Sequence, residues 1–204
     1  MEPFEYYVVL SSLILGLGIA QILTGVADIV SDLKNVKLEA AHSAMIFNVF
    51  LLHIQEWWYS YQYIFEIKVW SLPLVFFLLI YPILLFLLAR MLFPTGLRSH
   101  ETDLEEYFFD QWKWLYSVIL AIIITSFLQN IIVSGWAITS QIPQYVMTLL
   151  FTGFITLKVE NKRAHRIFQI IISILWLSFT LFDPYELTND MVMQEGKGWW
   201  NLIH

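Results

Sequence analysis

The sequence predicts an all-α integral membrane protein, a polytopic helical bundle with about six transmembrane helices. Of its 204 residues, 58% are hydrophobic and only 14% are charged, and the mean hydropathy is +0.65. Ordinary soluble domains carry roughly 25% charged residues. Six apolar stretches approach the length of about 20 residues that a helix needs to cross the hydrocarbon core. A soluble domain of this size could not bury so much apolar surface, so we expect the excess to face lipid.

The length of the chain is typical of one domain, and we expect a single transmembrane domain over residues 1–204. The absence of cysteine excludes disulfides, thiolate metal sites and cysteine nucleophiles. A net charge of −6 provides no basic surface for nucleic acid. The first apolar run begins at Tyr6 without a positive leader or a cleavage site, so we expect a permanent span rather than a signal peptide.

The first three expected spans cover residues 6–29, 41–63 and 70–92. Pro73 lies in the first turn of the third span, where a missing N–H group costs little. Pro82 lies in the middle of the same span and predicts a kink.

A polar loop, residues 93–111, separates the two halves of the chain. Within it, the residues Thr102-Asp103-Leu104-Glu105 fit a capping box, so the fourth helix is expected to begin before the membrane and enter it near Trp112. Pro143 lies in the first turn of the fifth span. The last three expected spans cover residues 112–133, 142–157 and 167–182, and a tail over residues 183–204 follows them.

The orientation follows from the distribution of positive charge. With six spans, nine of the eleven Lys and Arg residues fall in loops one, three and five, which share a side. Positive loops stay in the cytoplasm, so both termini are expected outside, on the periplasmic or extracellular face (N-out/C-out). The nine residues are Lys34, Lys37, Arg90, Arg98, Lys113, Lys158, Lys162, Arg163 and Arg166, whereas Lys68 and Lys197 lie on the other side.

Small and polar residues form one stripe on the first helix at alternating spacings of three and four. Such a stripe is typical of a seam where helix backbones approach closely, and we favour this interpretation. The alternative adds Gln21 and Asp28 to a polar pathway through the membrane. The packing residues of the stripe are Ser11, Gly18 and Gly25.

The second helix is polar over about half of its circumference. At about 100° per residue, its polar residues form two adjacent stripes, opposite a face of Phe, Leu, Ile and Trp. This helix is therefore expected at the centre of the bundle or beside a cavity. One stripe contains Asn48, Gln55, Tyr59 and Gln62, and the other contains His53, Glu56 and Ser60.

Depth along the helices predicts which polar residues meet. At a rise of about 1.5 Å per residue, Gln21 is level with Asn48 in the inner third of the membrane. Glu56 is level with the end of the fourth span, in the outer third. We therefore expect an inner contact between Gln21 and Asn48. We also expect an outer cluster of His53, Glu56, Gln129 and Asn130.

The pair His53 and Glu56 places an imidazole and a carboxylate about one helical turn apart. Ionisable residues inside a span are candidates for function, and this spacing suits a proton relay or half of a metal site. The structural alternative is that Glu56 is neutral or hydrogen-bonded to Gln129 or Asn130 and holds the bundle together. One His and one Glu cannot complete a metal site, so we expect no metal and no cofactor.

The leading hypothesis is a channel- or transporter-like protein that provides a polar pathway for an ion, a proton or a small solute. Six short helices leave little room for a wide pore, so conduction favours a homo-oligomer or a narrow crevice beside the second helix. The lipid bilayer is the expected environment, in a cell membrane and specifically the bacterial inner membrane.

Two alternatives remain open. One is a membrane scaffold or sensor subunit whose partner binds residues 98–110. The other is a membrane enzyme with an outward-facing site, which is less favoured because the sequence has no His-rich box, P-loop or dinucleotide fingerprint. Such an enzyme would combine Glu56 and His53 with the tail residues Asp183, Glu186 and Asp190.

Overall fold

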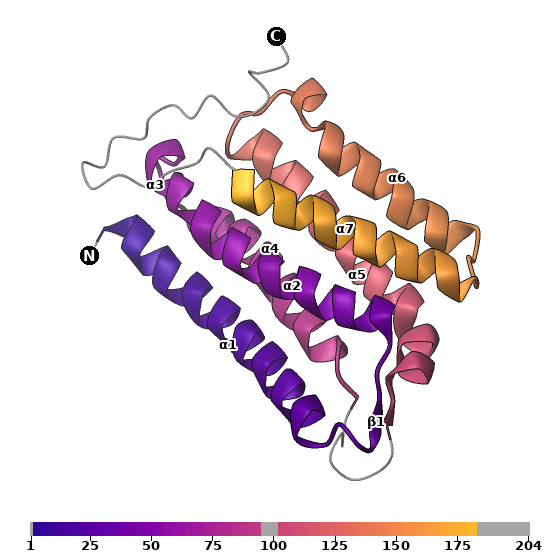
Figure 1. Cartoon of the computed structure of the whole chain (residues 1–204). Helices are drawn as coiled ribbons and strands as arrows, with labels where there is room; N and C mark the ends of the chain where they lie inside the picture. Colours follow the sequence, from indigo (N-terminus) through magenta and orange to yellow (C-terminus); the bar gives the residue numbers. More distant parts are fainter. Residues whose placement is uncertain (1, 95–101, 183–204) are drawn as a thin grey trace.

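The computed structural model describes residues 2–94 and 102–182, and helices dominate this part of the chain. Six of them have 15 to 29 residues and pack together as a bundle (Figure 1). The predicted helical class is therefore confirmed. The six helices are α1 (Pro3–Ser31), α2 (Ala40–Tyr59), α4 (Leu72–Met91), α5 (Leu104–Ile132), α6 (Ile142–Thr156) and α7 (Lys162–Phe182).

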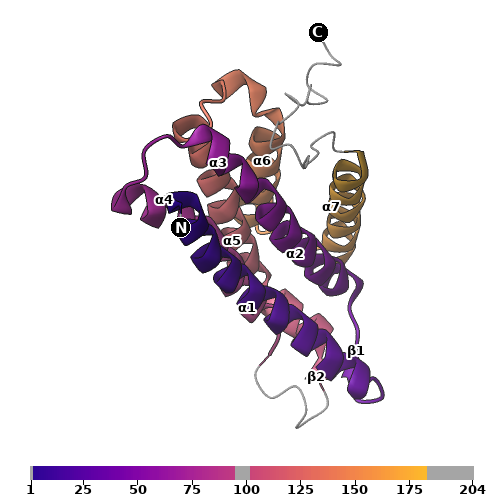
Figure 2. The same cartoon turned by 90° about the vertical axis from the view of Figure 1, so that its left-hand side faces the viewer.

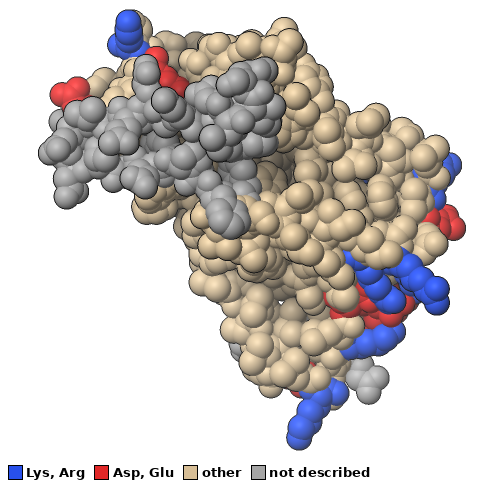
Figure 3. All heavy atoms as spheres, turned by 45° about the horizontal axis from the view of Figure 1, so that its top comes forward, with Lys and Arg blue, Asp and Glu red and all other residues tan. Residues whose placement is uncertain are grey.

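Three of these helices, α1, α4 and α5, are long and apolar enough to cross a membrane, and α6 is a shorter apolar helix. Their outward-facing side chains include Leu13 and Leu17 of α1, each 61% exposed. On the face drawn in Figure 3, charged side chains gather at the edges and leave the central surface uncharged where residues are described. Exposed apolar surface of this extent is what lipid contact requires.

Local signals place the helix ends. Glu2 and Glu5 form a capping box at the start of α1. Ser71 caps α4, and Pro73 lies in its first turn as predicted. The helix α5 begins at Leu104, well before Trp112, as predicted. Its capping residue is Asp103 rather than Thr102, and the Asp103 carboxylate accepts from the backbone N–H groups of Glu105 and Glu106.

The second predicted span is divided. After α2 the chain continues through a 3-10 turn (Ser60–Gln62) into the short helix α3 (Tyr63–Glu66). A second 3-10 turn, Ile138–Ser140, precedes α6. The sequence also gave no indication of two short strands, β1 (Val36–Lys37) and β2 (Thr102–Asp103), which pair in parallel.

The helix α2 lies between α1 and α7 in both views (Figures 1 and 2). It also packs on α4 and α5, while α6 packs on α5. A helix with four helical neighbours keeps most of its polar half away from the outer surface, and this agrees with the predicted central position.

Loops one, three and five meet at one end of the molecule, which we call the basic end. There Lys37 forms ion pairs with Asp103 and Glu105, and Arg166 donates two hydrogen bonds to Glu39, with N–O distances of 2.7 and 2.8 Å. Lys162 completes the cluster on Glu105. These hydrogen bonds favour the charged forms, lowering the pKa of Asp103 and Glu105 and raising that of Lys37 and Arg166.

The opposite end carries the start of α1 and the loops that follow α3 and α5. The hydroxyl of Ser134 donates to a carboxylate oxygen of Glu66 at 2.7 Å and joins these two loops. Burial raises the pKa of Glu66. Both ends of the bundle are therefore closed by side-chain bonds between loops far apart in the sequence.

Candidate functional site

The small-residue stripe of α1 is buried and faces α2 and α4. Ser11 is 1% exposed. A Cβ atom added to Gly18 would lie 2.2 Å from Nε2 of His53, and one added to Gly25 would lie 2.5 Å from the ring of Phe93. The two glycines therefore allow a histidine ring and a phenylalanine ring to lie directly against the α1 backbone.

The imidazole of His53 is fixed on one side and unpaired on the other. Its Nδ1 lies 2.7 Å from the carbonyl oxygen of Val49, one turn earlier in α2, so this nitrogen carries the proton. Its Nε2 is buried beside Gly18 and has no hydrogen-bond partner in the described part of the chain. The ring thus presents an unused acceptor to the α1 interface.

The carboxylate of Glu56 lies one turn further along α2. Its Oε1 is buried without a hydrogen-bond partner among the described residues, and the group is close enough to interact electrostatically with Tyr7, Tyr63 and Tyr81. Within the described part of the chain, the buried hydroxyls of Tyr7 and Ser11 also lack partners; they lie near each other but not in hydrogen-bonding geometry.

We call Tyr7, Ser11, His53 and Glu56 the unpaired cluster. Each unpaired buried polar group costs roughly 1–3 kcal/mol, and an ionised carboxylate costs more. Such groups are satisfied when water, a proton or a polar ligand reaches them, so these four residues are the candidate site.

Aromatic rings cover the unpaired cluster toward the opposite end. The ring of Tyr7 lies 6.0 Å from that of Tyr63 and 5.4 Å from that of Trp70, measured between centroids. Phe4 packs against Trp70 and Tyr61. This aromatic cap joins the start of α1 to the segment between α2 and α4, and it separates the cluster from that end of the molecule.

Gln129 does not hydrogen-bond to Glu56, contrary to the predicted outer cluster. Its amide Nε2 lies 2.9 Å from the carbonyl oxygen of Phe77 and 3.3 Å from that of Leu78. Pro82 has no N–H group and leaves the Leu78 carbonyl without its helical donor. Gln129 supplies that donor, so its position is explained by the interruption of α4.

The other predicted polar residues are divided among different contacts. Asn130 donates to Gln141 at 3.1 Å in the loop before α6. Asn48 donates to the side chain of Gln169 at 3.3 Å rather than to Gln21, because α7 lies against this face of α2. Gln21 and Asp28 are partly buried on α1. His53 and Glu56 thus lie one turn apart on α2, whereas Gln129, Asn130 and Asn48 hydrogen-bond to other residues.

A second polar group, which the sequence did not reveal, joins α2, α5 and α7. Nε2 of His165 lies 2.8 Å from the carbonyl of Val159, so its Nδ1 accepts from the hydroxyl of Tyr116 at 3.0 Å. Gln169 donates to that hydroxyl and accepts from Asn48. The spacing of four between His165 and Gln169 places both on one face of α7, and this was the available signal.

The residues described here contain no group of three His, Cys, Asp or Glu side chains arranged to hold a metal ion. The tail carboxylates Asp183, Glu186 and Asp190 lie outside the described residues.

No protein-family model, curated protein or solved structure matches the chain. The functional argument therefore rests on the geometry of the unpaired cluster.

The contact between Gly18 and His53 predicts that Gly18→Ala destabilises the bundle. The added methyl group would push against an imidazole that its bond to Val49 holds in place. Overpacking of this kind costs about 1–3 kcal/mol, measurable as a lower thermal unfolding temperature in detergent. Gly16→Ala is the matched control, since a Cβ there meets nothing within 4 Å. Equal effects of the two substitutions would show that close packing at position 18 is unimportant.

The bond between Gln129 and the interrupted α4 predicts a non-additive pair of substitutions. Gln129→Leu alone leaves the Leu78 carbonyl unpaired and is expected to destabilise the protein by about 1–3 kcal/mol. In a Pro82→Ala background that carbonyl regains its helical donor, so Gln129→Leu should cost less. Thermal unfolding of the four proteins measures the coupling, and additive effects would contradict the role given to Gln129.

Proposed function

We propose that the chain crosses the membrane six times, with the basic end in the cytoplasm and both termini outside. The proposal is supported by six long helices, by the apolar surface of α1 and α4, and by nine of eleven cations in loops one, three and five. The polar half of α2 does not argue against a span, because α1, α4, α5 and α7 surround it. The expected membrane is a cell membrane, the inner one in a bacterium.

Within this arrangement, we propose that the unpaired cluster binds a proton or a small cation as part of a transporter-like cycle. The observation that carries the proposal is that a carboxylate oxygen of Glu56 and, one turn earlier on α2, Nε2 of His53 are both buried without a hydrogen-bond partner among the described residues. A carboxylate in this environment is stabilised by a proton or a cation, and His53 offers a second acceptor one turn away.

The surroundings of the cluster favour a closed site over an open pore. The aromatic cap lies on one side of it. On the other side, one and two turns along α2 from His53, the interface is filled by the buried apolar residues Val49 and Met45, with Ile22 from α1 in the same core. Passage would therefore require the two sides to open in turn, as in alternating access.

A scaffold or sensor subunit is the second candidate. It is favoured by the hydrogen-bonded group of Tyr116, His165, Gln169 and Asn48, in which polar residues join helices to one another. A partner of such a subunit would bind at the basic end, over residues 98–110.

The orientation predicts which loops react with a reagent that cannot cross membranes. The chain has no cysteine, so single cysteines can be introduced without background. In intact cells, Ala137→Cys in the loop before α6 should react with an impermeant maleimide. Glu160→Cys, at the basic end, should react only after the cells are permeabilised. Both positions are exposed, and the reverse pattern would overturn the orientation.

The role of Glu56 predicts that Glu56→Gln abolishes proton- or cation-coupled flux in proteoliposomes. A pH-sensitive dye inside the vesicles, under imposed H⁺, Na⁺ or K⁺ gradients, measures the flux. Glu160→Gln removes an exposed carboxylate and should retain the wild-type rate. An inactive wild-type protein, or Glu56→Gln at the wild-type rate, would contradict the transport proposal and favour the scaffold.

A further inference from the structure

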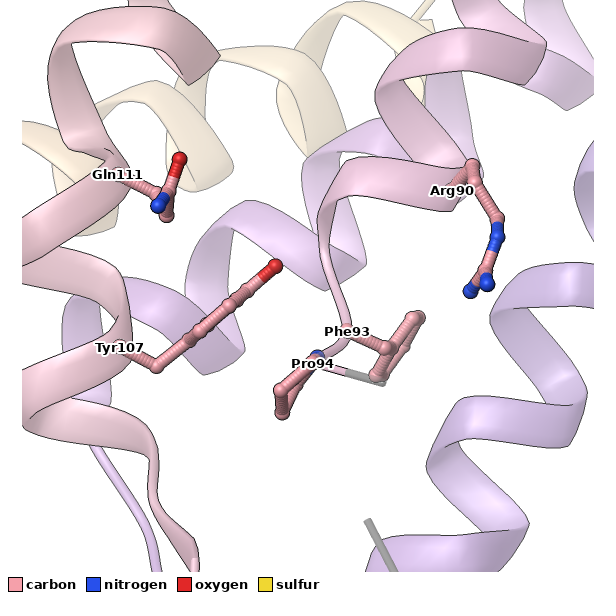
Figure 4. Close-up of a pocket in the computed structure, with 5 residues that line it drawn as sticks. All are labelled: Arg90, Phe93, Pro94, Tyr107 and Gln111. Atoms are coloured by element: carbon pink, nitrogen blue, oxygen red, sulfur yellow. The ribbon is translucent and has the colours of Figure 1, made fainter. Parts of the chain in front are cut away.

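A pocket of about 370 Å³ lies at the basic end, between the end of α4 and the first turns of α5. Figure 4 shows Arg90 and Phe93 on one side of it and Tyr107 and Gln111 on the other, with Pro94 between them. This pocket is separate from the unpaired cluster, and none of its residues has a part in the transport proposal.

The guanidinium of Arg90 is exposed and has no ion pair among the residues that the structure describes. Lys37, Lys162 and Arg166 at the same end all bind carboxylates. Arg90 therefore differs from them in presenting an uncompensated charge, and it does so at the edge of a recess.

The end of a helix carries partial negative charge on its last carbonyl groups, which would oppose an anion in this pocket. Two of these groups are already occupied. The hydroxyl of Tyr107 donates to the carbonyl of Met91 at 2.8 Å, and Nε2 of His42 donates to that of Leu92 at 2.7 Å. These bonds offset the negative end of α4 beside Arg90.

The pocket combines this charge with an uncharged donor and an apolar wall. The side-chain amide of Gln111 can donate a hydrogen bond from α5. Phe93 is only 4% exposed and packs against Gly25, so the apolar surface open to a ligand is provided by Pro94 and the ring of Tyr107. A ligand that fits has an anionic group next to an apolar portion.

We propose that this pocket binds the phosphate headgroup of an anionic phospholipid. The guanidinium binds phosphate oxygens through two parallel hydrogen bonds. Gln111, on the opposite side of the pocket, donates to the polar headgroup beyond the phosphate, and the glycerol backbone and upper acyl chain lie on Pro94 and the ring of Tyr107. Basic pockets at the cytoplasmic ends of membrane helices bind anionic lipids in this manner. The proposal rests on the membrane orientation given above but not on transport by Glu56.

The test is native mass spectrometry of the purified full chain, titrated with phosphatidylglycerol or phosphatidylcholine in a neutral detergent. The wild-type protein should retain phosphatidylglycerol selectively. Arg90→Gln should bind it roughly tenfold more weakly, the loss expected when a charge-assisted pair is removed. Arg163→Gln, which removes another exposed arginine at the basic end, should bind as the wild type does.

Three results would overturn the proposal. Arg90→Gln could bind phosphatidylglycerol as tightly as the wild type, or Arg163→Gln could lose as much affinity, which would indicate non-specific attraction to the basic end. Millimolar inorganic phosphate could displace the lipid completely, which would assign the pocket to free phosphate.

Gln111→Leu is the second variant and should weaken binding without removing a charge. Equal unfolding temperatures of the wild-type protein and the two variants verify that both variants fold. Because cysteine labelling and flux are measured separately, failure here is distinct from failure of the proposed function.

Discussion

Polar groups buried in an apolar helical bundle need partners within the protein, and this constraint organises the molecule around α2. The helix carries polar residues on about half its surface, and each neighbour meets a different part of that surface. Asn48 and Gln55 hydrogen-bond to residues of α7, while His53 lies against the glycine backbone of α1. The same constraint links α5 to α4, since Gln129 provides the hydrogen bond that Pro82 cannot. Four of the buried polar groups that lack a partner among the described residues belong to the unpaired cluster around Glu56, and this cluster is the candidate site.

The sequence predicts the helices well and their side-chain partners poorly, for a physical reason. Helix limits depend on local signals, such as the proline in the first turn of α4, the cap at Asp103 and the length of each apolar run. The distribution of polar residues around the circumference of α2 also predicted that this helix is central, because a half-polar helix keeps its polar side away from lipid. The hydrogen-bond partner of a side chain depends on which helices are adjacent and on how each helix is rotated about its own axis. Neither can be read from the residues next to that side chain in the sequence. Asn48 was assigned to α1 by depth alone, but α7 occupies the facing side.

The two ends of the bundle are held by different chemistry. At the basic end, Lys37, Glu39, Glu105 and Arg166 join three loops through ion pairs, supported by the pairing of β1 with β2. Opposite charges in contact explain why the carboxyl groups of Asp103 and Glu105 have lowered pKa values there. At the other end, contact between α1 and the segment before α4 depends on aromatic rings. Paired charges therefore hold one end of the bundle and aromatic contacts hold the other.

The interruption at Pro82 also bears on how opening of the bundle would be accommodated. A helix bends most readily where its hydrogen-bond ladder is already broken, and in α4 that point is held by a side chain of another helix. Because the amide of Gln129 reaches both the Phe77 and the Leu78 carbonyls, it can shift between them as the angle changes without leaving either end of the break exposed. The break in α4 is thus bridged by a side chain of α5, while the end of α4 is held at the basic end through Tyr107 and His42.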